Sequence, residues 1–347
     1  MTLLDTLTTI VGIPSVTGSE EELCSWIEGR FQRRYPTERI GKSLIVGRPS
    51  GGASFTTLYG HTDTVPVQGE PSARIDGDRI VGLGVSDMKA GLAVMIELLD
   101  SGVGESEGSL VCVFYDAEEG PAANNGLEAV LDEARWLIDA EISIVLEPTD
   151  LDLELGCNGV LNADVIFRGS TAHSARPWLG ENAITKAGNW LAGMHEREPE
   201  LVDIDGLEYR EVFSVTTASG GIANNIIPGE LVINLNYRFP PIYSIEQAEV
   251  RLLEVASASD EVVITDRAPS GKVNLDSLAV QRLDGLIGRK RLAKQGWTDV
   301  ARLTARGAVA VNYGPGEVAQ AHQVGESVPI ENLDVAYGVL ARFLAEP

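Results

Sequence analysis

The chain has 347 residues, 44% of them hydrophobic, and its 27 Lys and Arg against 51 Asp and Glu give a formal net charge of −24. This apolar content can form a sizeable core, and the length favours two domains and argues against disorder. The acidic balance and the scattered basic residues argue against a nucleic acid or an anionic membrane surface as the partner.

We expect neither a membrane span nor a secretory signal in this sequence. Its longest apolar stretches, such as residues 92–99, are far shorter than the ~18 residues needed to cross a bilayer. The N-terminal segment carries Asp5 and no basic residue, unlike a signal peptide. Cys24, Cys112 and Cys157 are widely spaced, which suits buried thiols in a reducing compartment. We therefore expect a cytoplasmic enzyme.

Residues 1–150 alternate between helical and strand patterns, which is typical of a layered α/β domain. A helix is predicted up to residue 31, beginning with a capping box formed by Ser19 and Glu22. Three apolar strand segments follow and run into polar ends, at residues 54–61, 109–119 and 142–150. Because ligands of open α/β sheets bind at the carboxyl ends of strands, we expect the chemistry at these ends.

Residues 159–267 are predicted to form a small α+β unit inserted into the α/β domain. Its predicted elements are strands at 162–169, 213–221 and 231–239 and helices at 182–196 and 244–258. The α/β pattern then returns with a helix at 278–294, a strand at 308–313 and a last helix from 331. Because insertions are tolerated where chain ends lie close together, residues 1–158 and 268–347 are predicted to form one domain.

His61, at the end of the first strand, is a candidate metal ligand. A lone histidine there is also compatible with a purely structural role, but residues two apart in an extended segment share a face, so Asp63 could orient the imidazole. Asp87 follows a Gly-rich turn before an apolar helix and fits either a helix cap or a ligand. A dinucleotide-binding turn is disfavoured because the third glycine of that motif is missing.

Carboxylates and a second histidine mark the other strand ends. Glu118 and Glu119 are adjacent, an arrangement that costs energy unless a cation or solvent neutralises it. Successive side chains point in different directions, so one can bind a metal while its neighbour faces a metal-bound water. Glu147 ends the third strand and His322 follows a Gly-Pro loop. This donor set of imidazoles and carboxylates suits zinc.

Motifs spread over nearly the whole chain carry a resemblance to a known family. They are GHTDTVP, GLGVSDMKAG, DAEEG, LEPTD, GSTAHSARP, ANNIIPGE and GPG followed by AH. By these motifs the chain resembles the co-catalytic zinc exopeptidase and deacylase family, which includes aminoacylases, acetylornithine deacetylases and succinyl-diaminopimelate desuccinylases. The resemblance implies a zinc-binding α/β domain with a mixed, mostly parallel sheet flanked by helices. A smaller α+β lid and dimerisation domain would interrupt it.

The resemblance also implies two Zn2+ ions per subunit, with Co2+ or Mn2+ as substitutes, and a homodimer. The implied ligands are His61 and Glu147 for one ion, Glu119 and His322 for the other, and Asp87 bridging the two. Glu118 corresponds to the general base and Asp63 to the residue that orients His61. His173 corresponds to a lid histidine that reaches the active site of the other subunit and stabilises the oxyanion.

The segments GWTDVARL, AVNYGPG and HSARPWLGENAI are most similar to succinyl-diaminopimelate desuccinylases. This similarity implies hydrolysis of N-succinyl-LL-2,6-diaminopimelate to succinate and LL-2,6-diaminopimelate, in lysine biosynthesis, by a metal-bridging hydroxide. The alternatives are an acetylornithine deacetylase or another N-acyl-amino-acid hydrolase of the family, and a non-catalytic metal-binding relative.

Such a substrate carries several carboxylates, so an acidic protein must supply arginines locally. Arg238 corresponds to a family arginine that contacts substrate carboxylate, and Asn224 to a lid residue that contacts substrate. Arg176 and Arg302 are further candidates, with a surface ion pair as the alternative for each. The run TDVAR ending at Arg302 departs from the Asp-Gly-Arg run of many desuccinylases. His195 is expected at the surface.

Overall fold

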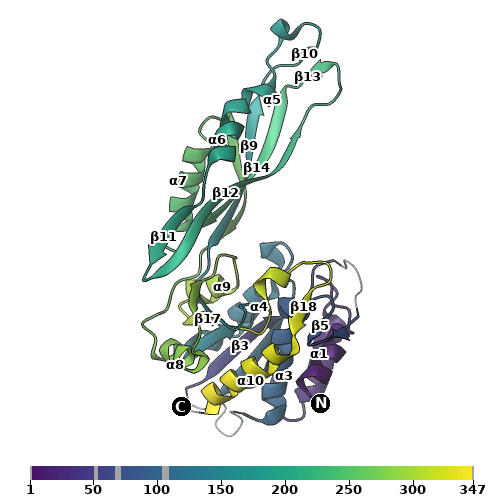
Figure 1. The fold of residues 1–347 in the computed structure, drawn as a ribbon, viewed down its shortest axis with the longest axis vertical. Coiled ribbons are helices and arrows are strands. Elements are labelled where there is room, and N and C mark those ends of the chain that lie inside the picture. The colour runs from purple at the N-terminus through teal and green to yellow at the C-terminus, as the bar shows by residue number, and fades with distance from the viewer. Residues whose placement is uncertain (1, 51–53, 67–71, 104–108, 346–347) are drawn as a thin grey trace. The chain divides into compact units, whose positions relative to one another are not determined.

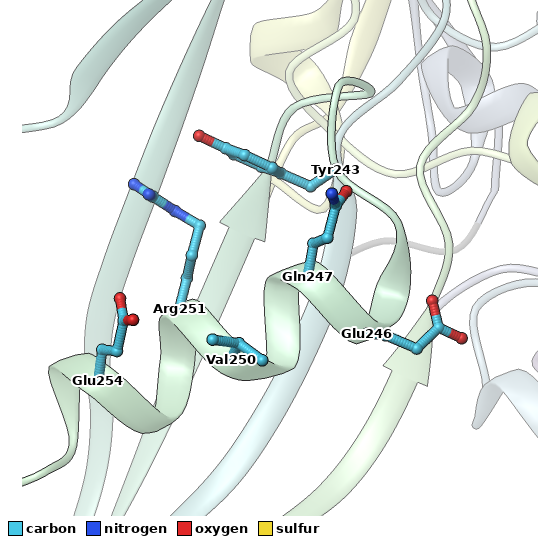
Figure 2. A pocket seen from close by; sticks show the side chains of 6 residues that line it. All are labelled: Tyr243, Glu246, Gln247, Val250, Arg251 and Glu254. Atoms are coloured by element: carbon cyan, nitrogen blue, oxygen red, sulfur yellow. The ribbon is translucent and has the colours of Figure 1, made fainter.

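The computed structural model describes residues 2–50, 54–66, 72–103 and 109–345, and the chain divides into two compact units (Figure 1). The first unit comprises Met1–Gly156, Lys272–Leu292 and Thr298–Pro347, and the second Cys157–Gly271 and Ala293–Trp297. Residues 293–297 fall within the predicted first domain, yet they pack with the second unit. The reason is that Gln295 donates to the Glu208 carbonyl at 2.8 Å and Trp297 to the Pro269 carbonyl at 3.0 Å.

The first unit contains an eight-stranded mixed sheet. In spatial order its strands are β1 (Thr37–Ile40), β2 (Ser43–Val46), β6 (Leu110–Tyr115), β3 (Thr56–His61), β7 (Ile142–Val145), β17 (Ala310–Asn312), β8 (Leu153–Leu155) and β16 (Arg291–Ala293). The run β6, β3, β7 and β17 is parallel, whereas β1 pairs antiparallel with β2, β2 with β6, and β8 with β17. A small antiparallel sheet adds β18 (Ser327–Pro329), β5 (Arg79–Val81) and β4 (Arg74–Asp76).

Helices cover both faces of the large sheet, which confirms the predicted α/β class (Figure 1). They are α1 (Leu3–Val11), α2 (Glu21–Phe31), α3 (Ala90–Ser101), α4 (Gly126–Glu133), α8 (Leu278–Ile287), α9 (Val300–Ala305) and α10 (Ile330–Ala345), with short turns η3 (Ala122–Asn124) and η4 (Arg135–Asp139). On one face, Tyr59 packs in a cluster with α4 and α9. On the other, a Cβ at Gly60 would lie 2.5 Å from Leu92 of α3. Among the described residues, no helix combines the length and apolar content that a membrane span requires.

Parallel pairing brings the ends of three strands to one edge of the sheet. β3 pairs with β6 up to the register pair His61 and Tyr115, and also with β7. The three strands are buried throughout, as expected for a parallel sheet covered on both faces. The polar residues that follow these strands in the sequence are therefore brought close together.

Two predicted helix ends are wrong. Helix α2 has Glu20 rather than Ser19 at its N-cap, and no side-chain capping bond forms. The Glu20 carboxylate instead accepts the Gly18 N–H at 2.5 Å and pairs with Lys42. Helix α8 ends at Ile287 instead of continuing to residue 294, because Gly288 adopts a left-handed φ of 61° that terminates it.

The second unit contains a five-stranded antiparallel sheet with helices on one face. Its strands, in spatial order, are β11 (Glu200–Ile204), β12 (Leu207–Gly220), β14 (Glu230–Phe239), β9 (Gly159–Arg168) and β15 (Glu261–Ala268). Its other elements are β10 (Ala172–His173), β13 (Ile226–Ile227), η5 (Pro177–Leu179), α5 (Ala183–Lys186), α6 (Gly188–Glu196) and α7 (Ile245–Val255). Alternate β14 residues such as Ile233 and Leu235 pack in one core with Leu252 of α7. The intervening residues, among them Asn236 and Arg238, are half-buried on the opposite face.

We predict opposite stability effects for two helical glycines. A Cβ at Gly91 in α3 would lie 2.5 Å from the Leu146 carbonyl oxygen, so Gly91→Ala should lower the free energy of unfolding by about 1–3 kcal/mol. A Cβ at exposed Gly29 in α2 would meet no atom within 4 Å, so Gly29→Ala should raise it by roughly 0.5–1 kcal/mol. Urea unfolding followed by circular dichroism measures both changes, and shifts of the same sign would contradict the packing described.

Candidate metal centre

Six titratable side chains meet at the strand-end edge of the first unit. They are His61 at the end of β3, Asp87 in the turn η1 (Val85–Lys89), Glu118 and Glu119 after β6, Glu147 after β7, and His322 after η6 (Val318–Gln320). They form three overlapping groups, in each of which the potential ligand atoms lie within 4.8 Å of one another. The groups are His61–Glu118–Glu119, His61–Asp87–Glu147 and Asp87–Glu119–His322.

The Asp87 carboxylate lies between the two histidines. Its Oδ1 is 3.2 Å from Nε2 of His61, and its Oδ2 is 3.6 Å from Nε2 of His322. A carboxylate whose two oxygens face two separate imidazoles can bridge two cations, each bound by one histidine. The same histidine, His322, also lies 2.8 Å from Oε1 of Glu119. This arrangement is compatible with two adjacent cation positions that share Asp87.

His61 is almost fully buried and is oriented by Asp63. Its Nδ1 lies 3.0 Å from the Asp63 carbonyl oxygen and 3.4 Å from the Asp63 carboxylate, which leaves Nε2 directed at Asp87. Burial lowers the pKa of His61, but the hydrogen bonds to Asp63 and Asp87 outweigh it and raise the pKa well above its ordinary value. An acidic partner on one ring nitrogen is the usual way to fix the tautomer of a metal-binding histidine.

The Asp63 carboxylate also holds the turn that carries the two glutamates. Its oxygens accept the backbone N–H groups of Glu118 and Glu119, each at 3.0 Å, and the Thr17 hydroxyl at 2.9 Å. Burial raises the pKa of Asp63, but its bonds to His61 and to the Glu119 N–H outweigh burial and keep the pKa below its ordinary value. Asp63 is therefore an anion that ties the ends of β3 and β6 together.

The electrostatics of the cluster favour a bound cation. Burial raises the pKa of Glu118 well above its ordinary value, and the nearby Glu147, Asp299 and Glu119 carboxylates raise it further against the opposing effect of His61. The pKa of His322 is raised to about 9, chiefly by its hydrogen bond to Glu119. Protons thus compensate the crowded carboxylates in the metal-free chain. Divalent cations fit this mixture of imidazole and carboxylate donors, and zinc, cobalt and manganese all accept it.

Four predicted substrate-contacting or catalytic residues belong to the second unit. His173 is exposed on β10 and its Nδ1 accepts the Ala175 N–H at 3.1 Å. Arg176 and Asn224 are exposed, at the start of η5 and before β13. Arg238 on β14 is half-buried and donates from Nε to the Asn236 side chain at 3.1 Å. The predicted surface residue His195 is exposed on α6.

Arg302 lies in an ion-pair network, which corresponds to the ion-pair alternative left open for it, except that the side chain is buried rather than at the surface. Only 9% of its side chain is exposed. Its guanidinium pairs with Asp299 at 2.8 Å, with Glu128, and with the Ala122 carbonyl at 2.9 Å. These contacts join α9 to α4, so the network satisfies Arg302 internally.

Two residues that support the site carry no motif signal in the sequence. Thr17 donates to Asp63, as described above. Glu326, 3% exposed, accepts backbone N–H groups of the turn that carries Asp87. Its position four residues after His322 was the only available hint, and spacing alone does not reveal a bond to a backbone distant in sequence.

Comparisons with known proteins find similarity over nearly the whole chain. Residues 57–346 match the model of peptidase family M20/M25/M40. A Mycobacterium tuberculosis protein named for succinyl-diaminopimelate desuccinylase (DapE) is 37% identical over 339 residues, which cover 96% of each chain. The succinyl-diaminopimelate desuccinylase of Corynebacterium glutamicum is 32% identical, covering 97% of this chain and 94% of its own. The acetylornithine deacetylase of Myxococcus xanthus is 30% identical, covering 89% and 84%.

Solved structures show the same fold. Aminopeptidase PepT from Bacillus cereus superimposes with a TM-score of 0.81 at 23% identity, covering 99% of this chain and 97% of its own. A Bacillus subtilis protein described as a dinuclear metal-binding peptidase from the M20 family gives a TM-score of 0.72 at 15% identity, covering 99% and 96%.

The raised histidine pKa values predict proton release on metal binding. A histidine with a pKa of about 9 is protonated at pH 7.5 and must lose that proton to become a ligand. Zn2+ added to the metal-free protein at pH 7.5 should therefore displace about one proton from His322, in addition to that from His61. Calorimetry in two buffers of different ionisation enthalpy measures the number. His322→Asn should lower it, whereas His195→Asn should leave it unchanged, and binding without proton release would contradict the prediction.

Proposed function

The chain belongs to peptidase family M20/M25/M40 and is a metal-dependent hydrolase, and we propose that it hydrolyses N-succinyl-LL-2,6-diaminopimelate to succinate and LL-2,6-diaminopimelate. The relatives at 37% and 32% identity over nearly the full length are named for this activity. The observation that carries the chemistry is the Asp87 carboxylate, whose two oxygens each face a different histidine. The acetylornithine deacetylase relative makes N-acetylornithine the second candidate substrate.

The proposed centre holds two Zn2+ ions. In this proposal His61 and Glu147 hold one ion, Glu119 and His322 the other, and Asp87 bridges them, as the family resemblance implies. The donor atoms lie within 4.8 Å of one another in two of the groups described above. Bound there, the two ions would lower the pKa of a water molecule and polarise the carbonyl of the scissile amide.

Glu118 is proposed as the general base. Water adds its oxygen to the amide carbon, Glu118 accepts the proton, and the C–N bond breaks as that proton passes to the leaving amine. Burial and neighbouring carboxylates raise the pKa of Glu118, and cationic charge nearby would lower it again. A carboxyl group balanced between these effects can both accept and return a proton. The backbone N–H of Glu118 donates to the Asp63 carboxylate, which limits the motion of the backbone that carries the Glu118 side chain.

Arg238 is proposed to bind a substrate carboxylate. Among the described residues no ion pair joins it to a carboxylate, and its Nε bonds only to the neutral side chain of Asn236. Burial lowers the pKa of Arg238, against the opposing charge of Asp266, so its charge is poorly solvated. An incoming carboxylate would provide the bidentate partner that a guanidinium favours. Asn224 and Arg176, both exposed in the second unit, are proposed as further contacts.

The second unit is proposed as a lid that mediates a homodimer. In this arrangement His173 would reach the site of the other subunit and donate a hydrogen bond to the oxygen of the tetrahedral intermediate. Its exposure on β10 is compatible with that role, and the family resemblance supports it.

A substrate comparison tests the proposed activity. The zinc-loaded protein, given N-succinyl-LL-diaminopimelate, N-acetylornithine and an N-acyl amino acid at equal concentration, should show a kcat/KM at least about tenfold higher for the succinyl substrate. Arg238→Met should remove that preference by raising KM roughly 10- to 100-fold, as for a lost charged hydrogen bond.

Arg168→Met is the matched control, because Arg168 lies in the same sheet but already pairs with Glu230 and Glu261. Its kinetics should match those of the wild-type chain. Preference of the wild-type chain for N-acetylornithine would replace the desuccinylase proposal with the deacetylase. An unchanged KM in Arg238→Met would remove that residue from substrate binding.

Two adjacent glutamates should respond differently to the same substitution. Glu118→Gln should lower kcat by at least about 10²-fold, because the base is lost, while the protein still binds two metal ions. Glu119→Gln should weaken metal binding itself, because it removes a proposed ligand. Metal content by elemental analysis, beside kcat, separates the two effects. Loss of metal in Glu118→Gln would show that Glu118 is a ligand and not the base.

A further inference from the structure

Glu326 is a buried carboxylate with an unusual set of partners. Its side chain is held inside the first unit with 3% exposure. Oε2 accepts the Gly84 N–H at 2.7 Å, while Oε1 accepts the N–H groups of Ser86 at 2.6 Å and Asp87 at 2.8 Å. All three donors belong to one short turn, and the acceptor lies about 240 residues away along the chain.

The turn cannot satisfy these donors by itself. Helix α3 begins only at Ala90, so the N–H groups of residues 84–87 precede its regular hydrogen bonds. Gly84 has a left-handed φ of 73°, and a Cβ there would lie 2.5 Å from the Thr64 side chain. The backbone at this point is thus narrowly constrained, and the Glu326 oxygens fix the direction in which its N–H groups point.

The same carboxylate couples two ligand-bearing segments. The backbone N–H of Asp87 is bonded to Glu326, which limits the motion of the Asp87 backbone. Glu326 in turn follows His322 by four residues in the sequence. A displacement of the His322 segment would therefore move the acceptor of the Asp87 turn as well. Oδ2 of Asp87 lies 3.6 Å from Nε2 of His322, so the two segments that Glu326 joins also carry facing side chains.

We propose that Glu326 is a positioning residue of the metal centre, which sets the Asp87 carboxylate against His322 by binding the backbone of the Asp87 turn. This inference rests on the proposed metal-binding roles of Asp87 and His322. Glu326 itself contacts neither the metal nor the substrate. Residues that hydrogen-bond to a metal-binding residue without contacting the metal typically lower metal affinity or activity by 10- to 100-fold when they are replaced.

Glutamine is the informative replacement because it preserves size and removes one acceptor. An amide oxygen could still accept the Ser86 and Asp87 N–H groups, but the amide nitrogen would then face the Gly84 N–H, donor against donor. Glu326→Gln should weaken binding of Co2+ to the metal-free protein by roughly 10- to 100-fold. It should also change the visible absorption of bound Co2+, and lower kcat at saturating metal with KM changed less than about threefold.

Glu317→Gln is the matched control. Glu317 lies in the same C-terminal segment and its carboxylate pairs with Arg79. Among the described residues, only its backbone bonds to the turn, through the Ser86 hydroxyl, and the substitution keeps that backbone. It carries the same change of charge, so its Co2+ affinity, spectrum and kcat should equal those of the wild-type chain. Glu326→Asp serves if the glutamine variant folds poorly: it keeps the charge but withdraws the oxygens by one methylene, so it should lose Co2+ affinity to an intermediate extent.

Wild-type Co2+ affinity and spectrum in Glu326→Gln, or in Glu326→Asp, would overturn the positioning role. That result is distinct from failure of the proposed function. A wild-type chain that binds two Co2+ ions but hydrolyses none of the three amides would defeat the proposed substrate and leave the Glu326 comparison intact.

Discussion

Two buried carboxylates, Asp63 and Glu326, hold the backbone of the turns on which the candidate metal centre depends. Asp63 accepts the N–H groups of Glu118 and Glu119, and Glu326 accepts those of the Asp87 turn. Hydrogen bonds to a charged acceptor contribute about 1.5–3 kcal/mol each, roughly twice a neutral bond. Because these hydrogen bonds act on the backbone rather than on side chains, they fix the backbone positions that carry the candidate ligands Asp87, Glu118 and Glu119. The parallel strands then bring these positions to one edge.

The cost of this arrangement is a concentration of negative charge, which both the fold and the solvent must offset. Asp63 lies beside His61, and His322 beside Glu119, so each histidine faces at least one carboxylate. Carboxylate partners raise the pKa values of both histidines, and burial together with neighbouring carboxylates raises that of Glu118, so protons bound to these groups offset part of the negative charge in the metal-free chain. Metal cations would compete with those protons for the same side chains, so a higher proton affinity would lower the apparent metal affinity. Metal affinity and pH are therefore linked here by the same contacts that shape the centre.

The sequence predicted which residues gather at the strand ends, because their positions depend on local pattern. A buried apolar run that ends in His61, Glu118 or Glu147 is visible without knowing its neighbours, and parallel pairing is the general solution for such runs. The partners that come from elsewhere in the chain were not predictable in this way. Glu326 binds backbone N–H groups, which leave no residue-type signature in the sequence. The ion pairs of Arg302 with Glu128 and Asp299 likewise depend on tertiary packing that the sequence pattern does not show. The end of helix α8 depends on the left-handed conformation of Gly288, which the periodic apolar pattern running on to residue 294 does not reveal.

Substrate choice requires features that the metal centre lacks. In the proposed function the cluster of histidines and carboxylates acts on an amide bond, the bond type that desuccinylases, deacetylases and peptidases have in common. Discrimination among acyl groups must therefore come from side chains that meet the rest of the substrate, and in an acidic chain these must be cationic. The second unit offers a polar sheet face on which Arg238 is held by the neutral Asn236. Most other arginines in the described chain form ion pairs with carboxylates of the protein, as Arg168 and Arg302 do. An arginine that is half-buried and bonded to an amide retains its attraction for an incoming anion, and a rigid strand sets its position more accurately than a loop would.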